Sequence, residues 1–251
     1  MPSLSLIVLL VDSRAPFLRE IYIKEIRKRW SHKNILTIYT KEDLTDSKSL
    51  ENCFNLFKPS SRHRIIKLLN QTISSLKLTP KESTNAVIVM GATNSGKSSF
   101  INLLVGSKKT KRSPEPGTTR GISRHKIPST SLIIYDSPGL FPSQVNKSVR
   151  SLLQLLNFLP STPDCREEFS EWGYNYLVRN YPKRLRQFLP EDIEELPIYP
   201  SFLELLATKY KLLEKKGELS IEKAEAKFIH IVRSGLLGKI LWGCPPANLQ
   251  T

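Results

Sequence analysis

The sequence predicts an α/β protein with a doubly wound, mostly parallel sheet and a small all-α C-terminal domain. Short apolar runs alternate with helical patterns over roughly the first hundred residues, and the runs are apolar enough to be buried on both faces of a parallel sheet. A phosphate-binding signature follows the fourth run. From about residue 146 onward the character changes to helical segments separated by prolines. We therefore expect one domain at 1–158 and a second at 159–251.

Each element of the expected sheet domain has a local signature. Strands are expected at 4–12, 34–40, 52–57 and 85–91, and helices at about 18–30, 42–50 and 61–77. The polar, proline-containing stretch 77–84 is typical of a connector. Beyond it we expect a helix from Lys97 to about Val105, followed by two strand-like runs that pair antiparallel across the turn "PSTS".

Composition argues against several classes of protein. No run approaches the roughly 18 uninterrupted apolar residues of a membrane span, so no transmembrane segment is expected. The apolar run at the start lacks a basic leader and ends in charge, which favours a buried strand over a signal peptide. The widely separated Cys53, Cys165 and Cys244 indicate neither a zinc site nor a disulfide framework, and a reducing compartment is expected.

Charge is distributed unevenly along the chain. The net charge is +15, and residues 1–150 hold 25 Lys and Arg against 10 Asp and Glu, whereas residues 151–251 hold 13 of each kind. Such an excess favours a polyanionic partner, with RNA the first candidate, over a merely solvated face. Our candidates for RNA contact are the basic residues that follow the phosphate-loop helix: Lys108, Lys109, Lys111 and Arg112.

The stretch "GATNSGKSSF" fits the phosphate-loop pattern G-x-x-x-x-G-K-[ST]. It follows a strand and opens a helix, which is the structural context that the pattern requires. In this motif Lys97 reaches the β- and γ-phosphate oxygens and Ser98 ligates Mg²⁺. The expected phosphate-binding residues are Thr93, Asn94, Ser95, Gly96, Lys97, Ser98 and Ser99, together with Gly139 from a later motif.

Two downstream motifs point to a GTPase of the translation-factor-like class. "DSPG" follows an apolar run, so that Asp136 can hold Mg²⁺ through water, Pro138 shapes the switch, and the Gly139 amide can sense the γ-phosphate. In "PEPGTTRG", Thr118 and Thr119 form the other switch, with Thr119 placed to close over Mg²⁺. The expected Mg²⁺ ligands are Ser98, Thr119 and Asp136.

A guanine-reading motif is expected after "DSPG", but no Asn-Lys-x-Asp follows a strand there. Upstream, however, Thr40, Lys41 and Asp43 of "TKED" end a buried strand. The Asp43 carboxylate can accept both guanine N1–H and N2–H, while the Lys41 stem covers the base. The roughly ninety residues before the phosphate loop are therefore predicted to hold the base-reading half of the domain.

With this order of motifs, the chain resembles the circularly permuted P-loop GTPases, most closely the YlqF/RbgA group and its mitochondrial Mtg-type relatives. The resemblance rests on "VDSRAPF", "TKED", "GATNSGKSSFINLL", "PGTTRG", "DSPGL" and the helical tail around "YNYLVRNYPKRL". It implies a GTPase of large-ribosomal-subunit assembly whose tail contacts ribosomal RNA. It also implies a monomer in the mitochondrial matrix or peripheral to the inner membrane, or in the cytoplasm of a bacterium.

The resemblance also sets expectations for turnover. GTP and Mg²⁺ are the implied cofactors, and Asn94 matches the residue that helps hold K⁺ in place of an arginine finger in similar GTPases. Thr40 stands where the family has an Asn, which predicts weaker guanine affinity or selectivity. No counterpart of the family's upstream histidine precedes "VDSRAPF", so slow intrinsic hydrolysis is expected. A non-hydrolysing rRNA scaffold and an ATPase with a degenerate base site are the alternatives.

Overall fold

The computed structural model describes residues 4–46, 50–76, 85–106, 123–191, 193, 195–215 and 217–243. The chain forms two compact units, Met1–Gln144 with Leu241–Cys244, and Val145–Ile240 with Pro245–Thr251. We call the first the sheet unit and the second the helical unit. No helix in the described ranges has both the length and the apolar character needed to cross a membrane.

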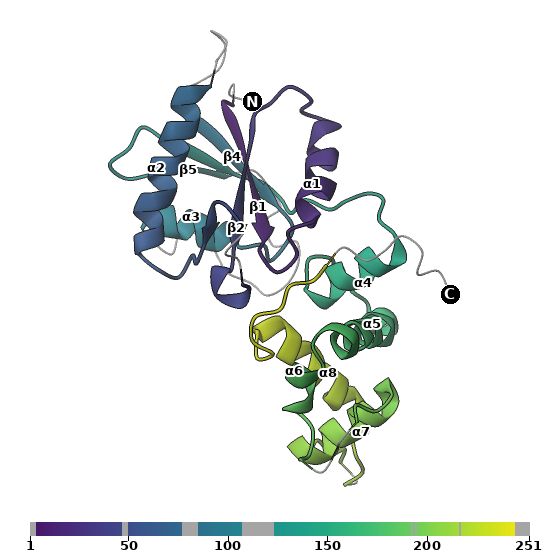
Figure 1. Ribbon diagram of the computed structural model, residues 1–251. Coiled ribbons are helices and arrows are strands. Elements are labelled where there is room, and N and C mark those ends of the chain that lie inside the picture. Colours follow the sequence, from purple (N-terminus) through teal and green to yellow (C-terminus); the bar gives the residue numbers. More distant parts are fainter. Residues whose placement is uncertain are drawn as a thin grey trace. The chain divides into compact units, whose positions relative to one another are not determined.

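The sheet unit is built on six strands in the order β3-β2-β1-β4-β6-β5 (Figure 1). They are β1 (Leu6–Asp12), β2 (Ile35–Thr40), β3 (Cys53–Phe54), β4 (Ala86–Gly91), β5 (Ser123–Lys126) and β6 (Ile133–Asp136). Only the β5–β6 pairing is antiparallel. The predicted doubly wound, mostly parallel sheet is confirmed, including the antiparallel pair across "PSTS".

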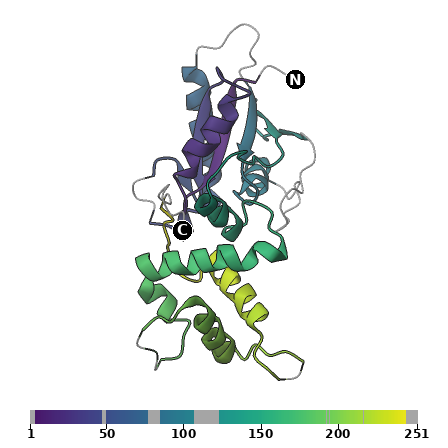
Figure 2. The same ribbon diagram turned by 90° about the vertical axis from the view of Figure 1, so that its right-hand side faces the viewer.

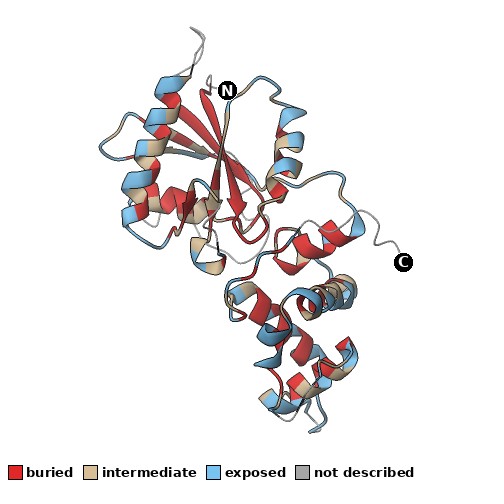
Figure 3. Ribbon diagram, viewed as in Figure 1, coloured by how far each residue is buried: buried red, intermediate tan, exposed pale blue. Residues whose placement is uncertain are grey.

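Helices cover both faces of this sheet. Figure 1 shows α1 (Leu18–Arg27) on one face, and α2 (Ser60–Ser75) and α3 (Lys97–Val105) on the other. Alternate strand residues such as Leu6, Val8 and Leu10 share a core with α2 and α3. In β1 and β4 the intervening residues are buried as well, as the red ribbon of these two strands in Figure 3 shows. Burial on both faces explains why β1 and β4 are continuous apolar runs.

The segment after β2 differs from the expected helix at 42–50. It forms only one short 3₁₀ turn, η1 (Glu42–Leu44), and residues 47–49 lie outside the described ranges. Lys41 has a left-handed backbone (φ 59°) and Thr45 is extended, so no α-helix can run through either residue. The Glu42 carboxylate accepts a hydrogen bond from the Asn55 N–H at 3.1 Å, which ties this turn to the end of β3.

The helical unit contains α4 (Lys147–Leu155), η2 (Pro163–Cys165), α5 (Arg166–Asn180), α6 (Pro182–Arg186), α7 (Tyr199–Tyr210) and α8 (Ile221–Ser234). Figure 2 views α5 from the side, with α8 packed against it. Tyr174, Phe202 and Phe228 form an aromatic core in which the Tyr174 and Phe202 ring centroids are 4.5 Å apart. These contacts join α5, α7 and α8 into one body.

The units divide after residue 144, earlier than the boundary expected after residue 158. The reason is that α4 packs closely on α5. Gly173 of α5 provides the space, because a Cβ there would overlap the Leu155 Cδ2 of α4. The amphipathic helix α4 therefore belongs to the helical unit.

The chain re-enters the sheet unit after α8, through Leu241–Cys244. The Trp242 N–H donates a hydrogen bond to the Arg14 carbonyl oxygen at 2.7 Å, and the Trp242 side chain is only 1% exposed. The helical unit is consequently connected to the sheet unit at both of its ends.

Candidate nucleotide-binding site

The predicted motifs meet at the carboxyl edge of the parallel sheet. Thr40 of β2 pairs with Asp12 at the end of β1, and Leu10 pairs with Gly91 at the end of β4. On the other side of β4, Val89 pairs with Asp136, the last residue of β6. Ligands of open α/β sheets bind outside the carboxyl ends of the strands, so this edge is the expected place for a nucleotide.

The phosphate loop has the backbone that its sequence predicts. Gly91 (φ 153°), Asn94 (φ 55°) and Gly96 (φ 99°) all have positive φ angles between β4 and the start of α3. A Cβ on Gly91 would lie 2.6 Å from the Leu10 carbonyl oxygen, so glycine is required there by close packing as well. Successive residues in such conformations turn backbone N–H groups toward one point, and α3 adds its N-terminal dipole.

Lys97 lies over this loop. Its Nζ donates hydrogen bonds to the carbonyl oxygens of Gly91, at 3.0 Å, and of Ala92, at 2.7 Å. Burial lowers the pKa of Lys97 to about 8, an effect that the nearby Asp136 carboxylate opposes. A buried, weakly compensated ammonium group is well suited to pair with phosphate oxygens.

The "DSPG" segment lies against the phosphate loop. The Leu140 N–H donates to the Gly91 carbonyl oxygen at 2.9 Å, and the Ser137 hydroxyl donates to the Val89 carbonyl oxygen at 2.8 Å. A Cβ on Gly139 would come within 2.7 Å of the Thr93 Cγ2, so this position also needs glycine. The structure therefore brings Pro138 and Gly139 beside the phosphate-binding residues.

The Asp136 side chain fits the expected role in holding Mg²⁺. Its Oδ1 is buried and has no hydrogen-bond partner among the described residues. Burial raises the pKa of this carboxyl, with Lys97 and His125 opposing the rise. A buried carboxylate oxygen at the end of β6, without a hydrogen-bond partner in the described ranges, is suited to bind a cation through the cation's water molecules. The other expected ligands are Ser98, at the second position of α3, and Thr119, which lies outside the described residues.

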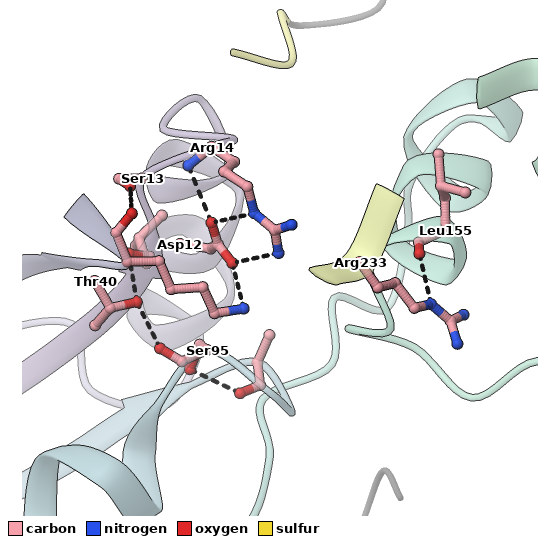
Figure 4. A network of polar contacts seen from close by, with 10 residues as sticks. Asp12, Ser13, Arg14, Thr40, Ser95, Leu155 and Arg233 are labelled. Atoms are coloured by element: carbon pink, nitrogen blue, oxygen red, sulfur yellow. Dashed lines mark hydrogen bonds and ion pairs between the residues drawn. The ribbon is translucent and has the colours of Figure 1, made fainter. Parts of the chain in front are cut away.

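The base-reading segment is joined directly to the phosphate loop. The buried Thr40 hydroxyl donates a hydrogen bond to the Ser95 carbonyl oxygen at 2.7 Å (Figure 4). Gly96 also packs here, since a Cβ on it would lie 3.6 Å from Thr40 Cγ2. The threonine hydroxyl therefore provides a brace between the base segment and the phosphate loop. Asp43 is exposed in η1, just beyond this brace.

An ionic cluster beside the base segment joins the predicted Lys41 to Asp12 and Arg14, which were not predicted as part of the site. The Asp12 carboxylate accepts hydrogen bonds from Arg14 Nε at 3.0 Å and Arg14 Nη2 at 2.9 Å, and pairs with Lys41 Nζ at 2.6 Å. The stretch "VDSRAPF" supports the family resemblance. Its polar triplet Asp12-Ser13-Arg14, at the end of a buried strand, is the sequence feature that could have indicated the cluster.

The remaining predicted residues cannot be placed. Thr118 and Thr119 of the second switch, and the candidate RNA contacts Lys108, Lys109, Lys111 and Arg112, all lie outside the described residues.

Comparison with known proteins agrees with this geometry. Residues 86–168 match a protein family described as 50S ribosome-binding GTPase. The probable ribosome biogenesis GTPase A of Mycoplasma genitalium is 30% identical over 245 residues, covering 93% of this chain and 86% of the relative. The corresponding Mycoplasma pneumoniae protein is 28% identical over 247 residues, covering 95% of this chain and 88% of the relative.

Solved structures show the same fold. GNP-bound YlqF from Thermotoga maritima aligns with a TM-score of 0.59 at 23% identity, covering 93% of this chain and 90% of that one. A GDP-bound YlqF structure aligns with a TM-score of 0.58 at 21% identity, covering 95% and 94%. Together with the near-full-length match to the Mycoplasma genitalium relative, this places the chain in the ribosome biogenesis GTPase A (YlqF/RbgA) family.

Proposed function

We propose that this protein binds GTP with Mg²⁺ at the carboxyl edge of the sheet, hydrolyses it, and acts in assembly of the large ribosomal subunit. The observation that carries the proposal is the Thr40–Ser95 hydrogen bond. It joins a base-reading segment to a phosphate loop that lies 55 residues further along the chain. The two halves of a nucleotide site are thereby held in one place despite their permuted order.

Guanine is the proposed base. Asp43 lies beyond the brace with an exposed carboxylate, which is suited to accept hydrogen bonds from guanine N1–H and N2–H. Adenine has no donor at N1, so it would leave that acceptor without a partner. The phosphates are assigned to the loop from Thr93 to Ser99 and to Gly139, and Mg²⁺ to Ser98, Thr119 and Asp136.

Hydrolysis is proposed to be slow in the isolated chain and faster with K⁺ and with ribosomal particles. Leu140 follows "DSPG", so this position offers no polar group to orient the attacking water. Asn94, with its left-handed backbone (φ 55°) in the phosphate loop, is our candidate for a K⁺ ligand.

Ribosomal RNA is the proposed docking partner. The whole net charge of +15 arises within the first 150 residues, while the remainder is neutral. An excess of basic residues of this size favours binding to nucleic-acid phosphates, with an affinity that falls steeply as the salt concentration rises. Neutralising Lys108, Lys109, Lys111 and Arg112 together should flatten that salt dependence while leaving GTP binding intact. A mitochondrial location and a monomeric state stay predictions from the resemblance.

Competition binding followed by a turnover assay tests the proposed function. GTP and ATP would compete with a fluorescent guanine nucleotide in Mg²⁺ buffer, with Lys97→Ala as the variant expected to lose binding. Equal affinities for GTP and ATP would favour an ATPase with a degenerate base site. Guanine binding without hydrolysis, even with K⁺ and large-subunit precursors, would favour a nucleotide-binding scaffold instead.

A further inference from the structure

Asp12 is a fully buried carboxylate at the end of the central strand β1. Both of its oxygens are engaged by cationic side chains, Oδ1 by Arg14 Nε and Oδ2 by Arg14 Nη2 and Lys41 Nζ. The Arg14 backbone N–H also donates to Oδ1, at 3.0 Å. In Figure 4 the Asp12 carboxylate lies beside the Arg14 side chain, with dashed lines joining the two.

Lys41 is held at both ends of its side chain. Its left-handed backbone is fixed by the Ser13 hydroxyl, which donates to the Lys41 carbonyl oxygen at 3.0 Å. The Ser13 N–H donates to the Thr40 carbonyl oxygen, also at 3.0 Å. The Asp12 carboxylate then holds the amine at 2.6 Å. A lysine stem has several rotatable bonds, so this arrangement removes much of its conformational freedom before any ligand arrives.

We infer that Asp12 is a positioning residue for the nucleotide base, which it serves by holding the Lys41 amine so that the lysine stem forms a fixed wall for the purine. Arg14 in turn fixes the orientation of the Asp12 carboxylate. The inference rests on the proposed function, because Lys41 faces a base only if this edge of the sheet binds a guanine nucleotide. Such pre-ordering favours binding by reducing the entropy lost when the base packs.

The electrostatics of the cluster agree with this role. Burial by itself would raise the pKa of Asp12, but Arg14 and Lys41 outweigh burial and hold that pKa well below its usual range. Burial lowers the pKa of Lys41, and Asp12 opposes this effect. Asp12 therefore compensates both cations of this cluster, so replacing it removes the ion pair that holds the lysine amine at 2.6 Å.

A double-mutant cycle on the full chain tests the inference. Asp12→Asn removes the charge with little change in shape, and Lys41→Met keeps an unbranched stem without the amine. GDP affinity would be measured by titration for the parent, both single variants and the double variant, with thermal melting of each as a check on folding. Glu25→Gln is the matched control, because Glu25 pairs with Lys28 at 2.7 Å on the exposed surface of the same unit.

Each single variant is expected to weaken GDP binding about tenfold or more, the range typical of breaking one buried charge pair. The double variant should bind like Lys41→Met, because Asp12 acts through that amine. Glu25→Gln should bind like the parent. Losses that simply add would show that Asp12 acts independently of Lys41, and unchanged binding by a folded Asp12→Asn chain would likewise overturn the inference. A parent chain that binds no guanine nucleotide would overturn the proposed function as well.

Discussion

Replacing Thr40 by valine isolates the brace between the base segment and the phosphate loop. Valine keeps the branched shape of threonine and removes only the hydroxyl that donates to the Ser95 carbonyl oxygen at 2.7 Å. Thr40 is 0% exposed, so water cannot replace the lost donor. We therefore expect Thr40→Val to destabilise the sheet unit and to weaken GDP binding by letting the loop move.

The chain supplies a matched control in Thr45. Its hydroxyl is also buried, at 1% exposure, but has no hydrogen-bond partner among the described residues. Loss of the Thr40 bond should cost about 1–2 kcal/mol of unfolding free energy, whereas Thr45→Val removes an unsatisfied polar group and should be neutral or stabilising by about 1 kcal/mol. Of the two chemically identical substitutions, only Thr40→Val is thus expected to lower stability.

Urea unfolding of the two variants and the parent, with fluorescent-GDP titration on the same samples, measures both effects. A lower urea midpoint at an unchanged slope reports a loss of stability alone. If Thr40→Val were as stable as Thr45→Val and bound GDP like the parent, the brace would have no role in holding the site together.

Three further predictions follow from single contacts. The negative charge of a bound phosphate would raise the pKa of Lys97 again from about 8, so GDP binding just above that pH should take up a proton. Calorimetry in two buffers with different ionisation enthalpies measures the uptake, and its absence would contradict the assigned contact. Asp43→Asn should cost guanine about 1–3 kcal/mol of binding free energy and shift preference toward xanthine; competition between GDP and XDP checks this, and an unchanged ratio would remove Asp43 from the base site. Gly173→Ala should destabilise the helical unit by about 1–3 kcal/mol, because the added Cβ overlaps Leu155. Thermal unfolding measures the loss. Gly217→Ala serves for comparison, because an added Cβ there meets nothing within 4 Å, although the positive φ of 84° adds some strain. Unchanged stability of Gly173→Ala relative to the parent chain would mean that α4 and α5 pack less closely than the overlap with Leu155 indicates.

The apolar runs and the phosphate loop were predictable because their signals are local. A strand buried on both faces, such as β1, must be apolar throughout, and the loop's glycines occupy backbone conformations that other residues avoid. The helix expected at 42–50 was wrong because Thr45 is extended and ends the turn after three residues, and because the chain enters that turn through a left-handed Lys41. The pattern of residue types reveals neither conformation, and the left-handed Lys41 is accompanied by contacts with Ser13 and Asp12 that are distant in the sequence.

The contacts that complete the site depend on strand register. Asp12 and Thr40 are neighbours only because β1 and β2 pair in parallel with those residues opposite each other. The substitution of threonine for the usual asparagine predicts a weaker base site, and this stays a prediction. Residue type alone does not reveal that the Thr40 hydroxyl reaches the Ser95 carbonyl oxygen. The hydrogen bond from the Trp242 N–H to the Arg14 carbonyl oxygen joins distant parts of the sequence, and no periodic pattern in the sequence predicts it.

That return of the chain makes the helical unit an insertion within the sheet unit. A domain attached by one linker can swivel about it, but a domain whose two ends are both anchored can transmit torque to the body that holds it. Here the second anchor is the Arg14 carbonyl, two residues from Asp12 and its ion pair with Lys41. The chain that returns from α8 is thereby tied by a backbone hydrogen bond to the sheet edge where we propose that the base binds.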